Sequence, residues 1–247
     1  MENKKLNFWD LMDNPDNKIV FAKHLYRHLI SNLKDAFGYC CREKMTLNEY
    51  CPLERFGNLK NEATTFISVR MSELWENAIF HAIKELFGEI EIDKDNVKRW
   101  TDAEGDIKIF NESWEIKTSQ AKDSFTGATH STHKVRKYIL VNYRIDRDIR
   151  LQLQVSNLKG FIPKLSIYIL DLTKSDDQNI WKGEAKRNSS FSTMHIKNDW
   201  VNSGCLKVIW GDINVTKFKN AKVIHKSPKY LDDNVRYDEL KKLISGK

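Results

Sequence analysis

Two carboxylates and one ammonium group, Asp106, Glu115 and Lys117, have types and a spacing that suit metal-assisted chemistry. They lie in the stretch from Glu104 to Gln120, which reads EGDIKIFNESWEIKTSQ. Two carboxylates that converge beside an ammonium group are costly unless a cation lies between them. The stretch therefore predicts a metal site, provided that the chain brings Asp106 to the same side as Glu115.

The elements that must position these groups are two short strands joined by a turn at Asn111-Glu112. Apolar residues mark the strands: Ile107, Ile109 and Phe110 in the first, Trp114 and Ile116 in the second. Side chains alternate across a strand, so Trp114 and Ile116 face a core while Glu115 and Lys117 share the other face. Asp106, on the neighbouring strand, can then reach the side of Glu115.

Asp106, eight intervening residues and then Glu115-Ile116-Lys117 resemble the catalytic hairpin of the PD-(D/E)XK nuclease superfamily, which includes most type II restriction endonucleases. Gly105 directly before Asp106 fits the Gly-Asp form that many members use in place of Pro-Asp. Gln120 echoes the E-x-K-x-x-Q variant of the motif. The resemblance covers the hairpin and its flanking elements, about residues 68 to 175.

The resemblance implies a Mg²⁺-dependent, sequence-specific endonuclease that cuts double-stranded DNA and leaves 5′-phosphate and 3′-hydroxyl ends. Asp106, Glu115 and the carbonyl of Ile116 would hold Mg²⁺, and Lys117 would position the attacking water. The implied fold is α/β (α+β) and restriction-endonuclease-like, with a central mixed sheet of about five strands flanked by helices.

A helix over residues 66–87, stopped by Gly88, shows the clearest apolar stripe in the chain. In the superfamily, the helix before the hairpin often supplies a further acid that supports the metal or the lysine. Glu76, at the border of the stripe, is the first candidate for this catalytic role and Glu73 is the second. The alternative is a boundary glutamate that pairs with Arg70 or Lys84.

The remaining periodicity predicts the rest of the sheet and its helices. Strands are expected at 89–92, 138–143, 151–155, 165–172 and 205–210. A helix over 16–37, capped by Asp16 and ended by Gly38, and the helix at 66–87 should cover the faces of the sheet. Residues 237–244 predict a C-terminal helix. His24 and His28 have metal-ligand spacing, but they are expected to be surface histidines because no glutamate or cysteine lies nearby in the sequence.

DNA contacts are predicted at two polar, basic stretches and at Gln120. The first stretch follows Gln120, and the second lies within residues 174–204. The candidate residues are His130, His133, Lys134 and Arg136 in the first, and Lys186, Arg187 and Asn188 in the second. A solvated basic loop is the alternative for the first stretch.

Composition is compatible with this assignment. The chain of 247 residues carries a net charge of +7, which suits a polyanionic partner without choosing between DNA, RNA and anionic lipid. No apolar run approaches the roughly 20 residues of a membrane helix. No signal-peptide core follows the N-terminus, so we expect a cytoplasmic protein. The four cysteines match no zinc spacing and are expected to be free thiols. The resemblance implies a prokaryotic source.

One endonuclease domain is expected over residues 1–247. It would comprise a helical N-terminal part at 1–65, a catalytic core at 66–175, and a DNA-recognition insertion with the C-terminal part at 176–247. One hairpin cuts one strand, so a C2 homodimer is expected, with its interface built from the helix at 16–37 or the C-terminal segment. A repair, junction-resolving or transposition nuclease and a non-catalytic nucleic-acid-binding module are the alternative functions.

Overall fold

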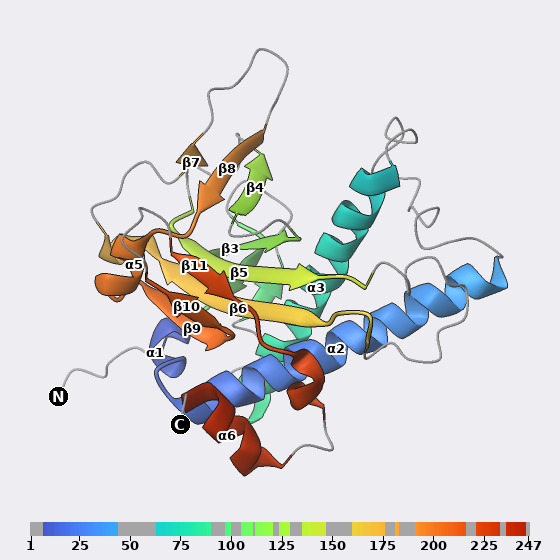
Figure 1. Cartoon of the computed structure of the whole chain (residues 1–247), viewed down its shortest axis with the longest axis horizontal. Coiled ribbons are helices and arrows are strands. Elements are labelled where there is room, and N and C mark those ends of the chain that lie inside the picture. Colours follow the sequence, from blue (N-terminus) through green and yellow to red (C-terminus); the bar gives the residue numbers. More distant parts are fainter. Residues whose placement is uncertain are drawn as a thin grey trace.

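The structure of the chain is a computed structural model. The structure describes residues 7–43, 63–89, 97–99, 105–110, 112–120, 124–128, 135–146, 160–175, 181–182, 191–215, 221–232 and 236–245. Its elements are arranged around one central sheet, with helices on one face and smaller sheets on the other (Figure 1).

Two long helices, α2 (Pro15–Arg42) and α3 (Ala63–Glu89), form the largest helical layer. Asn14 caps α2, because its Oδ1 accepts a hydrogen bond from the backbone N–H of Asp16 at 2.9 Å, and Pro15 occupies the first helical position, where proline needs no donor. The predicted cap at Asp16 is thus wrong by two residues. The predicted stop at Gly38 is also wrong, since α2 continues through it to Arg42.

The central sheet has six strands in the order β1-β2-β3-β5-β6-β9. The strands are β1 (Val97–Arg99), β2 (Ile107–Ile109), β3 (Glu112–Ser119), β5 (Lys137–Arg144), β6 (Lys164–Asp171) and β9 (Leu206–Trp210). The β3–β5 pair is parallel and the other pairs are antiparallel. The predicted mixed α/β architecture with a sheet of about this size is therefore confirmed.

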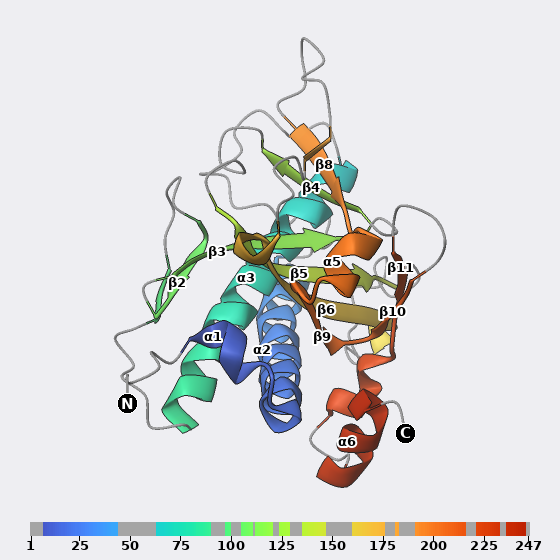
Figure 2. The same cartoon turned by 90° about the vertical axis from the view of Figure 1, so that its left-hand side faces the viewer.

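The helical face of the sheet carries the larger core. Short helix α1 (Phe8–Leu11), α2 and α3 pack there against alternate strand residues such as Trp114, Ile139 and Ile167. Figure 2 shows these helices together on one side of the sheet. The expectation that α2 and α3 flank the sheet needs correction, because both lie on the same face and pack along each other.

The second face is covered mainly by β structure (Figure 2). A three-stranded sheet contains β4 (Ser124–Ala128), β8 (Phe191–His195) and β7 (Trp181–Lys182), in that order. A hairpin of β10 (Asp212–Asn214) and β11 (Lys222–Ile224) and the short helix α5 (Asn198–Asn202) lie on the same side. Phe125, Met194 and Trp200 pack there against Tyr138 and Leu140.

Most predicted elements that fall in the described residues are present. The strands expected at 138–143, 165–172 and 205–210 correspond to β5, β6 and β9. Glu89 ends α3 rather than beginning a strand, and residues 90–92 and 151–155 lie outside the described residues. Two expected loops contain strands, β4 in the stretch after Gln120 and β7 and β8 within 174–204, because Phe125 and Met194 pair and are buried.

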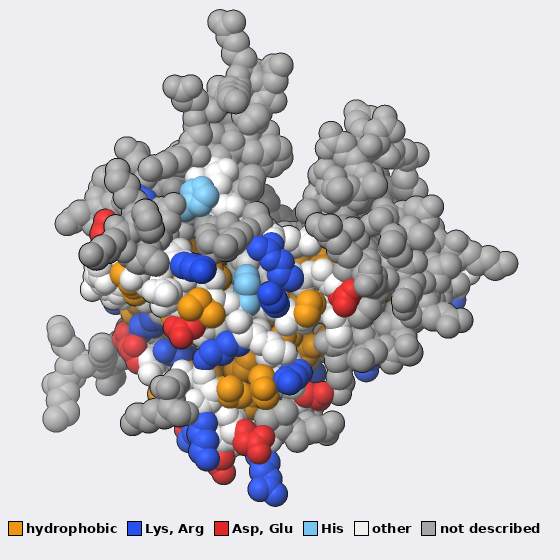
Figure 3. All heavy atoms as spheres, in the orientation of Figure 1, with side chains coloured by type: hydrophobic (Ala, Val, Ile, Leu, Met, Phe, Trp, Pro, Cys, Tyr) orange, Lys and Arg blue, Asp and Glu red, His pale blue; other side chains and the backbone are white. Residues whose placement is uncertain are grey.

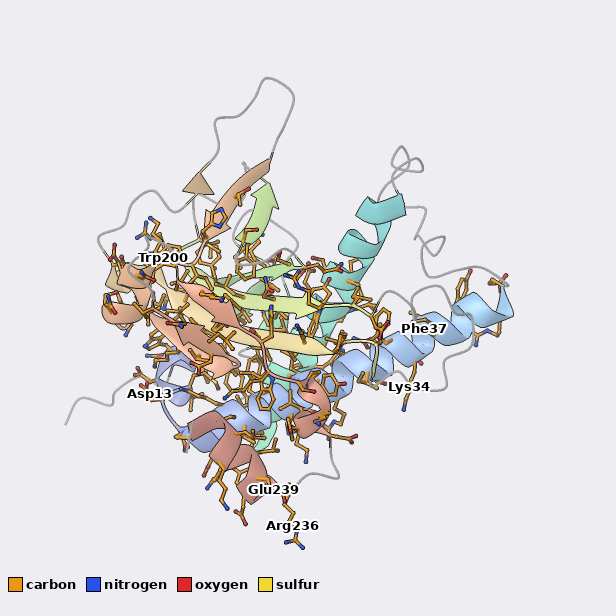
Figure 4. The ribbon with its side chains drawn as sticks, viewed as in Figure 1. Asp13, Lys34, Phe37, Trp200, Arg236 and Glu239 are labelled. Carbon is orange, nitrogen blue, oxygen red and sulfur yellow. The ribbon has the colours of Figure 1, made fainter. Side chains whose placement is uncertain are left out.

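The chain closes with 3₁₀ helix η4 (Pro228–Leu231) and α6 (Tyr237–Ser245), which confirms the expected C-terminal helix. Leu240 is buried in the helix-side core, and Lys241 pairs with Asp16 at 2.9 Å. Arg236 and Glu239 project away from the molecule on the outer side of this segment (Figure 4). Among the described helices, none has the length and apolar content to cross a membrane.

Candidate active site

Gly105 sets the position of Asp106 at the entrance to β2. Its φ is +115°, and a Cβ added there would lie 2.9 Å from the carbonyl oxygen of Trp114. Only glycine adopts this conformation with the backbone so close. The close approach lets the N–H of Asp106 donate to the Trp114 carbonyl at 3.0 Å. Asp106 is thereby held beside β3.

The Asp106 carboxylate is fixed by the backbone of β3. Its Oδ2 accepts a hydrogen bond from the N–H of Ile116 at 2.7 Å. Ile107 pairs with Trp114 in the hairpin, so Asp106 lies opposite Glu115 at the end of the ladder. Residues at such opposed positions have their Cβ atoms about 5 Å apart. The hairpin therefore brings the two carboxylates together, as the sequence predicts.

The turn of this hairpin is one residue earlier than expected. Ile109 pairs with Glu112, so Glu112 belongs to β3 and not to the turn. Phe110 has a φ of +49°, the left-handed region that a two-residue hairpin loop requires. Its ring packs against Phe87 of α3 with centroids 4.4 Å apart, so tertiary packing favours an aromatic residue where a small polar one is usual.

Glu115 and Lys117 share the second face of β3, as alternation predicts. Trp114 and Ile116 are in the helix-side core. The Glu115 side chain is only 4% exposed, and the Nζ of Lys117 donates to its Oε1. A carboxylate buried to this extent is rare unless it is paired. The pair thus places one ammonium group directly on the inner carboxylate.

Burial raises the pKa of Glu115 above its ordinary value. Lys117 opposes this rise through its charge and hydrogen bond, while the nearby charge of Asp106 adds to it, and the net direction is upward. Burial of Glu115, together with the nearby charge of Asp106, therefore outweighs the opposing effect of Lys117. A perturbed carboxylate with a specific charged partner is typical of functional sites.

The donor set fits a hard divalent cation. Mg²⁺ is usually held by one or two carboxylates and keeps several waters, and Asp106 and Glu115 supply two carboxylates in one place. Among the described residues, no group of three His, Cys, Asp or Glu side chains forms a metal cluster. Backbone carbonyls, such as that of Ile116, and waters are the further ligands that the described part of the hairpin can supply. Added positive charge would also oppose the effects of burial and of the Asp106 charge, which together raise the pKa of Glu115.

Glu76 and Glu73 are half-buried on α3, which approaches β3 from the helical face. The hydroxyls of Ser72 and Thr118 are 2.7 Å apart, so this part of α3 contacts the strand of the site. Glu115 and Lys117 lie on the opposite face of that strand. Support of the metal by Glu76 or by Glu73 stays a prediction.

Gln120 faces the helical side of the sheet. Its side chain hydrogen-bonds with the hydroxyl of Tyr143, a fully buried residue of β5 whose pKa is raised by burial. The Tyr143 ring lies 5.3 Å from that of Trp75 on α3. The sequence predicted that Gln120 contacts DNA. In the structure its hydrogen-bond partner is Tyr143, on the face of the sheet away from Lys117.

The other predicted DNA contacts are mostly outside the described residues, which do not include His130, His133, Lys134, Lys186, Arg187 or Asn188. Arg136 is described. Its guanidinium donates to the carbonyls of Leu172 at 2.7 Å and Ser175 at 3.4 Å. These bonds tie the start of β5 to the end of β6, a structural use that the charge pattern does not reveal.

A second cluster of two carboxylates and a lysine lies on the helical side of the sheet. The Lys137 Nζ is 2.6 Å from Glu112 and 3.7 Å from Asp171. Asp171 also accepts from the N–H of Thr173 at 3.0 Å, which caps 3₁₀ helix η3 (Leu172–Lys174). Asp171 thus organises local backbone, as Asp106 does at the first site, and the second cluster has a structural explanation in the cap of η3.

The sequence interpretation also misses a partner of the two α2 histidines. Glu85 of α3 contacts His24 and Arg27, and its Oε1 is 3.1 Å from His28 Nε2. The expectation of surface histidines is therefore wrong, because the glutamate comes from a different helix. The sequence would predict Glu85 as the partner of these histidines only if the packing of α2 against α3 were already known.

Comparison of the chain with protein-family models, curated proteins and solved structures found no match. Function is therefore inferred from the geometry at Asp106, Glu115 and Lys117.

Proposed function

We propose that the chain is a Mg²⁺-dependent endonuclease that cuts double-stranded DNA at specific sites, in the manner of type II restriction enzymes of the PD-(D/E)XK superfamily. The observation that carries the proposal is the buried Glu115 carboxylate, which lies beside Asp106 and accepts a hydrogen bond from Lys117. Packing and helix capping do not explain this arrangement.

Asp106 and Glu115 would hold Mg²⁺ through their carboxylate oxygens. The hydrogen bond from Ile116 uses Oδ2 of Asp106 and orients the carboxylate toward β3. Mg²⁺ held there would supply positive charge for the scissile phosphate and would acidify a coordinated water. The described carboxylates are preorganised for this task, since backbone contacts fix one and burial fixes the other.

Lys117 would act on the attacking water and on the phosphate. Its Nζ contacts Glu115, so it lies at the edge of the carboxylate pair. From there it can donate a hydrogen bond to a water or to a phosphate oxygen and stabilise the charge that develops during attack. Water adds its oxygen to phosphorus, the P–O3′ bond breaks, and the 3′ oxygen takes a proton to become a hydroxyl.

The direct test is cleavage of supercoiled plasmid DNA by the purified protein in Mg²⁺ and in EDTA, with the ends mapped by sequencing. Wild type should cut at a defined sequence only with Mg²⁺, and Lys117→Ala should be inactive while binding DNA almost normally. Lys34→Ala, at an exposed position of α2, is the control for loss of one charge. Lys117→Ala activity within about tenfold of wild type would remove Lys117 from the mechanism.

Cleavage of branched or damaged DNA in preference to intact plasmid would instead favour a junction-resolving or repair nuclease with the same site. Binding without cleavage in Mg²⁺ would favour a non-catalytic nucleic-acid-binding module. Double-strand breaks at one locus need two sites, so a C2 homodimer on a palindromic or near-palindromic sequence belongs to the proposal. A cytoplasmic, prokaryotic setting belongs to it as well.

A further inference from the structure

The second face of the central sheet changes character along its strands. Near the site it is apolar, with Tyr138 and Leu140 of β5 beside Leu170 and Tyr168 of β6. Further along, the same face carries polar residues at successive paired positions. They are Ser119 on β3, Asn142 and Arg144 on β5, and Ser166 and Lys164 on β6.

Arg144 and Lys164 are directly opposite each other in the β5–β6 pair and share this face. Lys164 is exposed and Arg144 is partly exposed. Like charges at opposed positions destabilise a sheet. Within the described part of the chain, the ion pairs of lysine and arginine involve neither residue. Such a pair of cations is favourable where an anion is bound.

His225 lies next to this surface, toward β11. Its Nδ1 is 2.8 Å from the hydroxyl of Ser166, which fixes the orientation of the ring. Lys226 pairs with Leu165 through a two-way backbone bridge, so this segment lies along the start of β6. Figure 3 shows Lys and Arg side chains gathered beside a histidine near the centre of the face that carries β6 and β11.

We propose that Arg144, Lys164 and His225 bind the sugar-phosphate backbone of the DNA duplex, to one side of the phosphate that is cut. The inference rests on the proposed function, because it takes the duplex substrate as its partner. Charge complementarity selects this occupant, since Arg and Lys supply most phosphate contacts of DNA-binding proteins. This surface is distinct from the stretches for which the sequence predicted DNA contacts.

The register places this surface within reach of a duplex held at the site. Lys117 is paired with Leu140, and Arg144 lies four residues further along β5 on the same face. At about 3.3 Å per residue the separation along the strand is about 13 Å. This is close to the roughly 12 Å width of the major groove of B-DNA. Along β5 the two positions are thus separated by about one groove width.

The test compares Arg144→Gln/Lys164→Gln with Lys34→Gln/Lys229→Gln, which removes the same charge from exposed positions on α2 and η4. Lys34 projects away from the sheet (Figure 4). Binding to a short fluorescein-labelled duplex is measured by anisotropy in EDTA, which excludes cleavage, between about 50 and 200 mM salt. The first variant should bind about tenfold or more weakly, with a salt slope smaller by about two, while the control stays within about threefold of wild type.

Equal losses in the two variants would overturn the inference, because they would show a general charge effect. Heparin, another polyanion, serves as a comparison ligand. The inference would also be overturned if the first variant bound heparin more weakly than wild type but bound the DNA duplex equally well. Plasmid cleavage in Mg²⁺ separates this result from the proposed function. If wild type cleaves DNA but the first variant binds the duplex as tightly as wild type, the proposed nuclease function is supported and the proposed DNA contact at this surface is wrong. If the first variant alone loses duplex binding but wild type does not cleave DNA, the DNA contact at this surface is supported and the nuclease function is wrong.

Discussion

Two glutamates of this molecule, Glu115 and Glu85, both lie among cationic side chains, yet their pKa values shift in opposite directions. Partial burial pushes the pKa of Glu85 up, but the hydrogen bond from His24 and the charges of His24, His28 and Arg27 together lower it below 4.5. At Glu115, burial and Asp106 outweigh Lys117, and the pKa is raised.

The difference separates a structural ion pair from a candidate catalytic site. Glu85 is surrounded by more positive than negative groups, is 35% exposed, and joins α2 to α3. Glu115 is 4% exposed and shares its surroundings with another carboxylate, so its charge is under-compensated. Stability favours the first arrangement and opposes the second. An arrangement that costs stability is expected where function requires it.

The largest effect is expected when each of the two glutamates is replaced by glutamine and the two variants are compared. Glu115→Gln should lower plasmid cleavage by more than about a hundredfold, since it removes a metal ligand and the partner of Lys117. Its thermal midpoint without metal should be unchanged or higher, because a costly buried charge is lost. Glu85→Gln should retain cleavage. If both variants lost activity equally, the distinction between the two sites would fail.

The next largest effect is expected at Gly105. Gly105→Ala forces a side chain into a left-handed conformation and against the Trp114 carbonyl at 2.9 Å, which should displace Asp106. We expect cleavage to fall by about tenfold to a hundredfold and stability to fall by about 1–3 kcal/mol.

Gly204→Ala is the matched control for this prediction. Its φ is +73°, but a Cβ there meets nothing within 4 Å. It should cost about 1 kcal/mol of stability and leave plasmid cleavage unchanged. Equal losses of cleavage for Gly105→Ala and Gly204→Ala would show that backbone strain, and not the position of Asp106, limits activity.

The smallest effect concerns the stability supplied by Glu85. A lowered pKa means stability that is present above the ordinary value of 4.5 and is lost as the pH falls through the folded value. Glu85→Gln should therefore lower the free energy of unfolding by at most about 1 kcal/mol near neutral pH, after solvent screening of a partly exposed pair. The deficit, measured by urea denaturation, should shrink below about pH 4. A deficit that grows in acid would contradict the ion-pair account.

The sequence predicts the local geometry of the site better than its surroundings. Alternation places Glu115 and Lys117 on one face of β3, because strand periodicity is a local property. The hairpin turn is displaced by one residue, since the packing of Phe110 against Phe87 overrides turn propensity. The left-handed φ of Gly105 follows from contact with Trp114, which the Gly-Asp motif does not explain by itself.

Long-range pairing limits what the sequence can show elsewhere. Amphipathic spacing finds α2 and α3, yet it cannot reveal that both lie on one face of the sheet or that Glu85 meets His24. The contact of Gln120 with Tyr143 and the opposition of Arg144 and Lys164 likewise depend on strand order and register. A local motif therefore indicates which residues belong to the site, and topology decides what surrounds them.

The most direct test of the central claim is the position of a divalent cation in crystals soaked in Mn²⁺, a substitute for Mg²⁺ that anomalous scattering can locate. The account predicts an anomalous peak between the carboxylates of Asp106 and Glu115, absent in Glu115→Gln, and no peak at His24, His28 and Glu85. A peak at the Glu85 cluster with none between Asp106 and Glu115 would contradict it.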